Sequence, residues 1–569
     1  MKISKILSVA AAVAVAGGMA YAGTSKMDFA KVYEKECQGC HGPIHQGGVG
    51  SDLRPKVLKK KNAEMLAETI LNGRPGTAMP AWKHMFSKDD AAGMVDWLMN
   101  WKNTVELKLD LDQIKKSWKK LADRDELFKK YPTPTDVKSV KDIVFATERD
   151  ASLVDFIDGT TGKVLSRHKA GFAVHVTVTN KRMPRYAYSI SRSGRLTMFD
   201  LYAPGQPAIA SVQVGQESRG LAVSPDGKYV MAGNYNPGGA VLCDAKTLEP
   251  LKVYPTSSVI DPDGNIGPSR VAYIADTPYA PYFSFALKDG GHVYIVDYSK
   301  PDFPIVGDIP NIGKILHDAF ENEGKQIGRF VYVASQGSDL MGVVDLKTKK
   351  LAAKIYTGPG TKPHPGQGSS WYNKEYGQLN ATNSMNVGDV VIWDMNNEVV
   401  AHVPTAGGGL FIGTSKDTPY LWSDCVLGGP NNYNKVYLIN KETLETDRII
   451  EVGKEKGRLI DAHTHKVIQE WDATQYETVK GKEVKSKISN EMLLTYTAKH
   501  GPKVKKPVQP RLLHAEPANH GEWTFISEWT TGRIGIYESK TGKFVKYIYN
   551  LTTPTFTYSV EHRQEVPGA

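Results

Sequence analysis

Two cysteines and a histidine near the start of the chain have the spacing that covalent haem attachment requires. Residues 37–41 read Cys-Gln-Gly-Cys-His, so two residues separate the thiols and the histidine follows at once. Thiols at this spacing reach the two vinyl groups of one porphyrin, and the adjacent imidazole points at its iron. We expect Cys37 and Cys40 to carry haem c and His41 to be the proximal ligand. A redox-active thiol pair or half of a zinc site is the alternative, but no second cysteine pair exists to complete a zinc site.

A methionine in a loop rich in Gly and Pro is the candidate for the second axial ligand. Met79 lies in Arg-Pro-Gly-Thr-Ala-Met-Pro-Ala-Trp over residues 74–82, between two segments of helical apolar spacing. Small c-type cytochromes place a methionine in such a loop, on the far side of the iron from the histidine. We therefore expect Met79 to be the distal ligand of haem c.

The first residues have the pattern of an export signal. Lys2 and Lys5 precede an Ala/Val-rich run that ends in Ala-Tyr-Ala at residues 20–22, a small-x-small cleavage pattern. We predict a signal peptide over 1–22 and a periplasmic location. No later stretch reaches the ~18 to 20 apolar residues that cross a bilayer, so no membrane span is expected.

The charge balance and the remaining cysteines narrow the class of protein further. The chain has 71 Lys and Arg against 61 Asp and Glu, a formal net charge of +10, with lysines clustered at 56–61 and 115–120. In an exported haem protein, solvated helix faces or a docking surface for an acidic electron-transfer partner explain these clusters better than nucleic acid. Cys243 and Cys425 are expected to be buried thiols, with one disulfide between them as the alternative.

The period of the apolar residues changes near residue 140. Residues 27–101 have helical spacing, residues 102–140 are polar and Lys-rich, and the remainder alternates as strands do. We predict a small all-α cytochrome c domain over 23–104, a linker with one helix over 105–140, and an all-β domain over 141–569.

The all-β domain repeats one pair of strands. Each copy has a short apolar strand, an Asp or a neighbour of it, a turn of Lys, Thr or Gly, and a second strand. The copies begin at Ser152, Arg195, Ala240, His292, Met341, Asp389, Lys435 and Arg533. Eight copies predict an eight-bladed β-propeller in which each pair is the outer half of a four-stranded blade. Because the last interval is about twice the others, we interpret residues 454–506 as an insertion between the seventh and eighth blades; the alternative is that the count of blades is off by one.

Histidines and arginines stand between the repeats, where loops of a propeller line its central channel. The histidines are His175, His317 and His364, and the arginines are Arg149, Arg192, Arg219 and Arg270. Taken singly, each is more commonly a satisfied loop residue. Their recurrence between successive blades favours a cationic ring that holds the carboxylates of a porphyrin-like ligand.

These motifs together resemble one family. GFAVH at His175, RSGRLTMFD from Arg192, LHD at His317, KPHPGQG at His364, GGGLFI and the C-terminal LTTPTFTYSVEH are similar to cytochrome cd1 nitrite reductases over nearly all of the mature chain. The resemblance implies that His175 is the axial ligand of a non-covalent haem d1 and that His317 and His364 lie above its iron. The four arginines match positions near the haem carboxylates.

The same resemblance implies an activity and its partners. Haem d1 would bind nitrite, and electrons would enter through haem c to give nitric oxide and water in a one-electron reduction. A small soluble c-type cytochrome or a cupredoxin is the expected donor, and a homodimer is the expected assembly. Two histidines can supply protons near neutral pH, which this reaction needs.

Two features depart from the family, and rival functions stay open. Gln367 stands where the family commonly has arginine, which removes a positive charge beside His364. His463, His465 and His500 in the insertion have no assigned role. One rival is a paralogue with the same two haems that oxidises the haem d1 precursor; others are a non-catalytic carrier of haem d1 or of electrons, and a quinone-cofactor propeller dehydrogenase.

Overall fold

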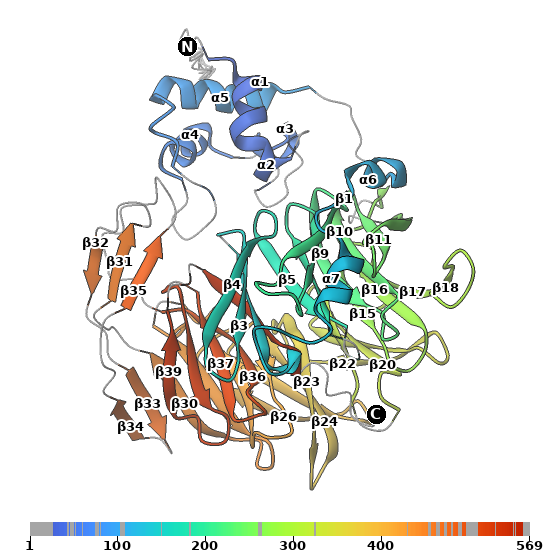
Figure 1. Cartoon of the computed structure of the whole chain (residues 1–569), viewed down its shortest axis with the longest axis vertical. Coiled ribbons are helices and arrows are strands. Elements are labelled where there is room, and N and C mark those ends of the chain that lie inside the picture. Colours follow the sequence, from blue (N-terminus) through green and yellow to red (C-terminus); the bar gives the residue numbers. More distant parts are fainter. Residues whose placement is uncertain are drawn as a thin grey trace, which may run out of the picture.

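A small helical domain precedes a large ring of β-sheets (Figure 1). The computed structural model describes residues 27–42, 45, 51, 53–59, 61–73, 79, 81–102, 108–149, 151–180, 182, 184–259, 264–323, 326–429, 431–452, 510–529, 531–549, 551 and 553–561, and the backbone alone of five strands within 457–496. The predicted signal peptide lies outside these residues. Among the described helices, none is long and apolar enough to cross a membrane.

Helices of the first domain pack around one apolar core, which contains Tyr33, Leu71, Met94 and Leu98. The chain supplies side-chain caps at the helix starts, since Asn62 accepts from the N–H of Met65 and Ser87 forms a capping box. The elements are α1 (Phe29–Val32), η1 (Tyr33–Cys37), α2 (Gln38–His41), α3 (Pro55–Leu58), α4 (Ala63–Asn72) and α5 (Lys88–Asn100).

The segment between the domains is more structured than its polar sequence indicates. It contains α6 (Leu111–Ser117), β1 (Lys119–Lys120) and α7 (Arg124–Lys130), and 3-10 helix η2 (Val140–Asp142) follows. The prediction of one helix over 105–140 is wrong, because Asp110 and Asp123 each cap the start of a separate helix. Trp118 donates from Nε1 to the carbonyl of Thr247 at 2.9 Å, which fastens this segment to the propeller.

Eight sheets with a core of four strands each form the propeller, so the predicted fold class is confirmed. In the first blade the C-terminal strand β40 (Pro554–Ser559) pairs with β2 (Ile143–Glu148), which closes the ring. That blade continues with β3 (Leu153–Asp158) and β4 (Lys163–Lys169).

The next three blades follow in chain order. They comprise β5 (Val174–Thr179), β6 (Tyr186–Ser191), β7 (Arg195–Asp200) and β8 (Ala208–Gln213), to which β1 adds; β9 (Glu217–Val223), β10 (Tyr229–Asn236), β11 (Gly239–Asp244) and β12 (Pro250–Pro255); and β15 (Val271–Asp276), β16 (Tyr282–Leu287), β17 (His292–Asp297) and β18 (Ile305–Ile309). A separate hairpin, β13 (Ser258–Val259) with β14 (Ile266–Gly267), joins the third blade to the fourth.

The last four blades repeat the arrangement. They comprise β19 (Leu316–Glu321), β20 (Phe330–Ser335), β21 (Leu340–Asp345) and β22 (Lys350–Tyr356); β23 (Pro363–Asn373), β24 (Gly377–Ser384), β25 (Asp389–Asp394) and β26 (Val399–Pro404); β27 (Ile412–Gly413), β28 (Tyr420–Asp424), β29 (Lys435–Asn440) and β30 (Thr446–Val452); and β36 (Leu512–Ala518), β37 (Trp523–Glu528), β38 (Arg533–Glu538) and β39 (Phe544–Ile548). The eight strand pairs found in the sequence are the outer two strands of the blades.

Between the seventh and eighth blades the chain adds five strands. They are β31 (Gly457–Asp461), β32 (Val467–Trp471), β33 (Gln475–Val479), β34 (Lys482–Ser486) and β35 (Met492–Tyr496). Strand β33 pairs with β30, and β31 lies between β32 and β35 in a sheet of its own. His463, His465 and His500 lie outside the described residues, as does the side chain of Gln367.

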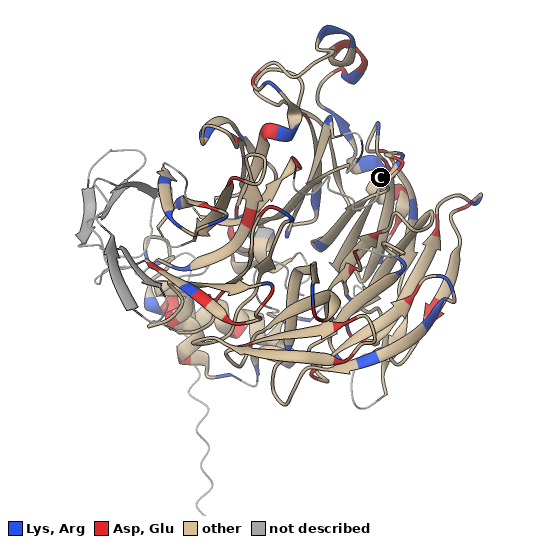
Figure 2. Cartoon of the chain, turned by 90° about the horizontal axis from the view of Figure 1, so that it is seen from below, with Lys and Arg blue, Asp and Glu red and all other residues tan. Residues whose placement is uncertain are grey.

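In the first blade, burial rises from the outer strand to the channel. In the first blade the outer strand β4 alternates between exposed and half-buried residues, whereas every residue of β2 and β40 is buried. Lys and Arg are interspersed with Asp and Glu over the strands and loops (Figure 2). Cys243 and Cys425 are free, fully buried thiols, as predicted.

Candidate active site

The cysteines and histidine of the haem c motif lie on one continuous helical stretch, Cys37 on η1 and the other two on α2. Both thiols are free and half-buried, and burial raises the pKa of Cys37 to about 11 and also raises that of Cys40. The imidazole of His41 is almost buried, and its Nδ1 lies 2.7 Å from the carbonyl oxygen of Ser51. Since a carbonyl oxygen only accepts, Nδ1 donates, and Nε2 is the nitrogen that would bind iron. These residues fit haem c.

Met79, the predicted distal ligand of haem c, is half-buried. Residues 74–78 and 80, which flank it, lie outside the described residues, so its role as a ligand stays a prediction.

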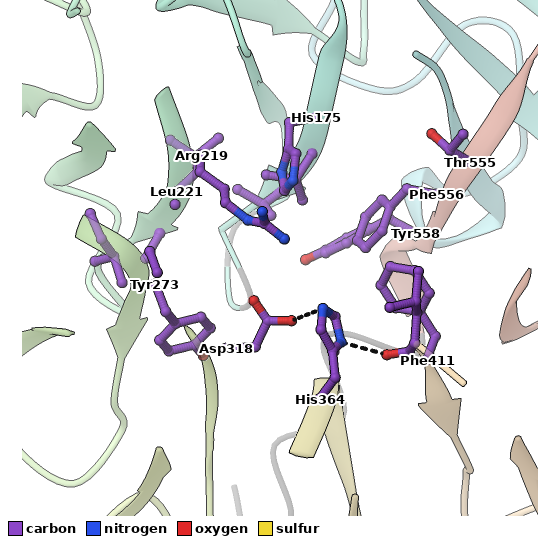
Figure 3. A pocket seen from close by; sticks show the side chains of 18 of the residues that line it. His175, Arg219, Leu221, Tyr273, Asp318, His364, Phe411, Thr555, Phe556 and Tyr558 are labelled. Atoms are coloured by element: carbon purple, nitrogen blue, oxygen red, sulfur yellow. Dashed lines mark hydrogen bonds and ion pairs between the residues drawn. The ribbon is translucent and has the colours of Figure 1, made fainter. Parts of the chain in front are cut away.

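At the centre of the propeller lies a cavity of about 280 Å³ (Figure 3). Inner strands or the loops before them contribute from all eight blades. Residues that represent the blades in order are Phe556, His175, Arg219, Ala272, Asp318, His364, Leu410 and Leu513. Two of the three predicted histidines, His175 and His364, line the cavity directly.

Functional side chains lie at irregularities in the inner strands. The pairing of β5 skips from Val174 to Val176, and that of β19 skips from Leu316 to Ala319. The skipped residues are His175 in the first strand, and His317 and Asp318 in the second. A β-bulge of this kind turns a side chain out of the regular alternation, here toward the channel.

His175 is held as a neutral imidazole. Loss of solvent, followed by the positive charges of Arg219, Arg192 and Arg149, holds its pKa well below the ordinary value. Its Nδ1 is buried, and no residue in the described part of the chain makes a hydrogen bond to it. An uncharged imidazole with a nitrogen left over is what an iron ligand requires.

Across the cavity, His317 and His364 share one carboxylate (Figure 3 shows His364 and Asp318). Nδ1 of His317 lies 2.8 Å from Oδ1 of Asp318, and Nε2 of His364 lies 3.3 Å from Oδ2. The two imidazole centroids are 4.8 Å apart. His317 does not line the cavity itself, but its partner Asp318 and the neighbouring His364 do.

Burial and the nearby charges shift the pKa values of His317, His364 and Asp318 in opposite directions. Burial and then Arg219 lower the pKa of His317 well below its ordinary value, although Asp318 raises it. Burial also lowers the pKa of His364, against the attraction of Asp318. Burial alone would raise the pKa of Asp318, but both histidines, the hydrogen bond from His317 and Arg219 hold it far below its usual range. Asp318 is therefore an anion.

The four predicted arginines form two groups. The guanidinium carbons of Arg192, Arg219 and Arg270 lie 5.2, 5.9 and 5.3 Å from the ring centre of Tyr235. Arg149 instead lies 6.0 Å from the ring centre of Trp529. Only Arg149 and Arg219 line the cavity.

The two predicted arginines that do not line the cavity, Arg192 and Arg270, each pair with a carboxylate. Arg192 forms an ion pair with Glu217, and Nε of Arg270 lies 3.1 and 3.0 Å from the carboxylate oxygens of Asp289. Nε of Arg219 is buried and, within the described residues, has no hydrogen-bond partner. Nε of Arg192 is likewise without a hydrogen-bond partner among the described residues, but Arg192 does not line the cavity, whereas Arg219 does.

The donor set fits haem d1. A neutral His175 can bind iron, and Arg219 and Arg149 can bind carboxylates at the edge of a flat tetrapyrrole. Apolar side chains such as Leu221 and Phe556 line the space between them.

Sequence reasoning missed three further residues of this region. Asp318 follows His317 directly, so its place in the LHD motif was the available signal. Lys288 is buried and donates to the carbonyl of Leu316 at 3.3 Å; burial, then Arg219 and Arg270, lowers its pKa to about 7. His514 lies on a bulge of β36 and stacks on Phe556 with ring centres 4.4 Å apart, and no motif marked it.

A small domain with a haem c motif, joined to a propeller whose central cavity contains a neutral buried histidine and arginines, is the architecture of a two-haem electron-transfer protein. Residues 138–563 match the family described as Cytochrome D1 heme domain, and residues 25–98 match that described as Cytochrome C oxidase, cbb3-type, subunit III. Because the first match covers more than half of the chain, the chain belongs to the cytochrome D1 heme domain family. It is an oxidoreductase of the cytochrome cd1 family with haem c and haem d1 as its cofactors.

Relatives with two different activities are equally similar. The chain is 27% identical to a nitrite reductase of Stutzerimonas stutzeri over 470 residues, which covers 75% of this chain and 80% of that protein. It is also 27% identical over 437 residues to a dihydro-heme d1 dehydrogenase of Pseudomonas aeruginosa, covering 75% of this chain and 83% of that protein. The solved structure of dihydro-heme d1 dehydrogenase NirN in complex with DHE superposes with a TM-score of 0.70 at 24% identity, covering 94% of this chain and 99% of that one, which shows the shared fold. The reaction must therefore be argued from the site.

Proposed function

We propose that this protein reduces nitrite to nitric oxide. The reaction takes up one electron and two protons per nitrite and releases one water, because the N–O bond breaks as the leaving oxygen becomes water. The observation that carries the proposal is the pair of imidazoles, His317 and His364, held on one carboxylate across the cavity from His175. The reaction needs two protons, and the adjacent His317 and His364 are two side chains that could each donate one.

His175 would bind the iron of haem d1, and Arg219 and Arg149 would bind its carboxylates. When bound, haem d1 supplies the iron that accepts nitrite, and haem c supplies the electron. On this side of the cavity the chain would orient the group, and burial together with the surrounding arginines would keep His175 uncharged.

His364 and His317 would hold and deliver the protons. Asp318 stabilises a proton on either ring, while burial and Arg219 make that proton easy to give up. His364 lines the cavity, so it would donate first, and His317 would then replenish it through Asp318.

The environment of the reaction follows from the sequence pattern. We propose a periplasmic protein, released from residues 1–22, that takes electrons from a small c-type cytochrome or a cupredoxin. A homodimer is the proposed assembly.

One assay tests the function. Purified holoprotein, with haem d1 verified by its optical spectrum, is given nitrite and a reduced donor while nitric oxide is monitored. We expect nitric oxide from the wild type and strongly slowed turnover, with both haems retained, in His317→Ala and His364→Ala. A d1-loaded protein that forms no nitric oxide would refute the proposal, and full activity in both variants would refute the roles of the histidines.

Asp318 favours a second candidate, oxidation of a dihydro-haem d1 precursor. Two histidines whose pKa values are lowered are neutral bases, and the charge of Asp318 stabilises protons that they accept. Removal of hydrogen from such a substrate releases two protons and two electrons. The precursor added to d1-free protein with an electron acceptor would then acquire the spectrum of haem d1. Formation of that spectrum without nitric oxide production would select this candidate.

A further inference from the structure

The loop before β27 contains three consecutive glycines that pack against the backbone. A Cβ on Gly407 would collide with Gly428, one on Gly408 with the carbonyl of Met385, and one on Gly409 with the carbonyl of Asp424. The loop therefore lies closer to its neighbours than any other residue type allows. This explains the GGGLFI motif as a packing requirement.

Hydrogen bonds fix the same loop on each side. The N–H of Gly409 donates to the carbonyl of Ser384 at 2.9 Å, and the N–H of Leu427 donates to the carbonyl of Gly408 at 2.8 Å. The side chain of Asn383 donates to the carbonyl of Phe411 at 2.6 Å.

The carboxylate of Asp424 is the central anchor. It accepts the N–H of Leu410 on Oδ1 at 2.8 Å and that of Phe411 on Oδ2 at 2.9 Å. The N–H groups of His514 and Val426 approach it at 3.3 and 3.4 Å. Asp424 is 2% exposed and is not among the residues that line the cavity, so it does not meet a ligand there.

The anchored loop presents one carbonyl to the site. Nδ1 of His364 lies 2.8 Å from the carbonyl oxygen of Leu410, and Nε2 of the same ring faces Asp318. Both partners only accept, but the carbonyl contact at 2.8 Å is shorter than the 3.3 Å contact with Asp318, so we assign the hydrogen of the neutral ring to Nδ1. Proton exchange is then confined to Nε2, the nitrogen on the side of Asp318.

We propose that Asp424 is a positioning residue that fixes the tautomer and the orientation of His364 through the Leu410 peptide. The catalytic consequence rests on the proposed role of His364 as a proton donor, whereas the tautomer itself does not. In Asp424→Asn one oxygen is replaced by an NH2 group, which cannot accept from the Phe411 or Leu410 N–H. The loop must then shift, and the Leu410 carbonyl loses its fixed direction toward His364.

The first test needs no variant of Asp424. Histidine labelled with ¹⁵N in the full-length protein reports which ring nitrogen carries hydrogen, and the signal missing in His364→Gln identifies His364. We expect the Nδ1–H form in the wild type. The Nε2–H form in the wild type would overturn the proposal, whatever reaction the protein catalyses.

The second test compares Asp424→Asn with Asp297→Asn. Asp297 is also buried on a blade strand and accepts a backbone N–H, that of Ser299 at 2.9 Å, but it makes no contact with the cavity. We expect the His364 signal to lose its uniform Nδ1–H signature in the first variant only, with turnover lowered roughly 10- to 100-fold, the range seen when partners behind a functional histidine are removed. An unchanged His364 signal in folded Asp424→Asn would overturn the proposal. Should that variant fail to fold, Asn383→Ala weakens the same loop at Phe411 and is read in the same way.

Discussion

Replacing Asp318 by asparagine removes the charge that His317 and His364 share. The substitution keeps the shape of the side chain and one oxygen, so the imidazoles lose the anion and little else. If these rings deliver protons to nitrite, the variant should retain both haems and lose turnover.

The contact distances set the size of the effect. Opposite unit charges 3.3 Å apart, the separation of His364 Nε2 and Asp318 Oδ2, attract by about 5 kcal/mol at an effective dielectric constant near 20. Removing one partner of a buried ion pair costs about 3 to 5 kcal/mol in proteins. Water entering beside the asparagine offsets part of this, so we take about 3 kcal/mol as the loss of stability of the protonated pair. That is roughly a 100-fold loss of turnover at pH 7.

The negative charge of Asp318 determines the direction in which turnover of the variant changes with pH. Asp318 raises the pKa of both histidines, so its removal lowers both pKa values further, while Arg219 continues to act in the same direction. The variant should therefore recover part of its turnover as the pH is lowered from 7 toward 5, more steeply than the wild type does.

The assay measures nitric oxide formation from pH 5 to 8 in wild type, Asp318→Asn and the control Asp297→Asn, after both haems are quantified optically. Wild-type turnover in folded, d1-loaded Asp318→Asn at pH 7 would show that the charge of Asp318 does not support proton delivery by His317 and His364. A uniform loss with no change in pH dependence would show that Asp318 orients the rings but does not govern their protonation.

Three further predictions test the cofactor sites and the buried charge. His175→Ala should abolish the optical bands of haem d1 and leave those of haem c; unchanged d1 content would disprove the axial role. The double variant Cys37→Ala/Cys40→Ala should show no haem retained on a denaturing gel, in contrast to the wild type. Lys288, with a pKa lowered to about 7, binds one proton fewer in the folded than in the unfolded chain between pH 7 and 10.5, so it makes stability rise by about 1.4 kcal/mol per pH unit there. Chemical denaturation of Lys288→Met at pH 7.5 and 9 should show that rise removed, and an identical slope in both proteins would contradict the burial of Lys288.

The outer strands could be predicted from the sequence because they obey one local rule. A strand pair such as that from Ser152 alternates apolar and polar residues around a tight turn, and that pattern depends only on neighbouring residues. The inner strands break the repeat where they carry the site, as at His175 and at His317 with Asp318, because each bulge differs from the next. The histidines were therefore found by their recurrence between the repeats, and the bulges that carry them were visible only in the structure.

Contacts between distant segments could not be predicted in this way. His364 and Leu410 are 46 residues apart, and Asp424 acts through a peptide bond that no side-chain motif describes. The same is true of the arginines. Their recurrence favoured one cationic ring, whereas three of them lie around Tyr235 and the fourth lies beside Trp529. The local sequence pattern predicts which residue types belong to the site, whereas the folding of the eight blades into a ring determines which of these residues are in contact.

One residue type serves two opposed roles in this cavity because its neighbours differ. Burial, followed by Arg219, Arg192 and Arg149, lowers the pKa of His175 and keeps its ring uncharged. His364 faces Asp318, which supports a proton on the opposite side of the same space. Among the described residues, Asp318 forms ion pairs with His317 and His364 and none with His175, so its charge favours a proton on the pair more than on His175. If His175 binds iron and the pair supplies protons, this separation of charge would let the ligand stay deprotonated while the donors are loaded.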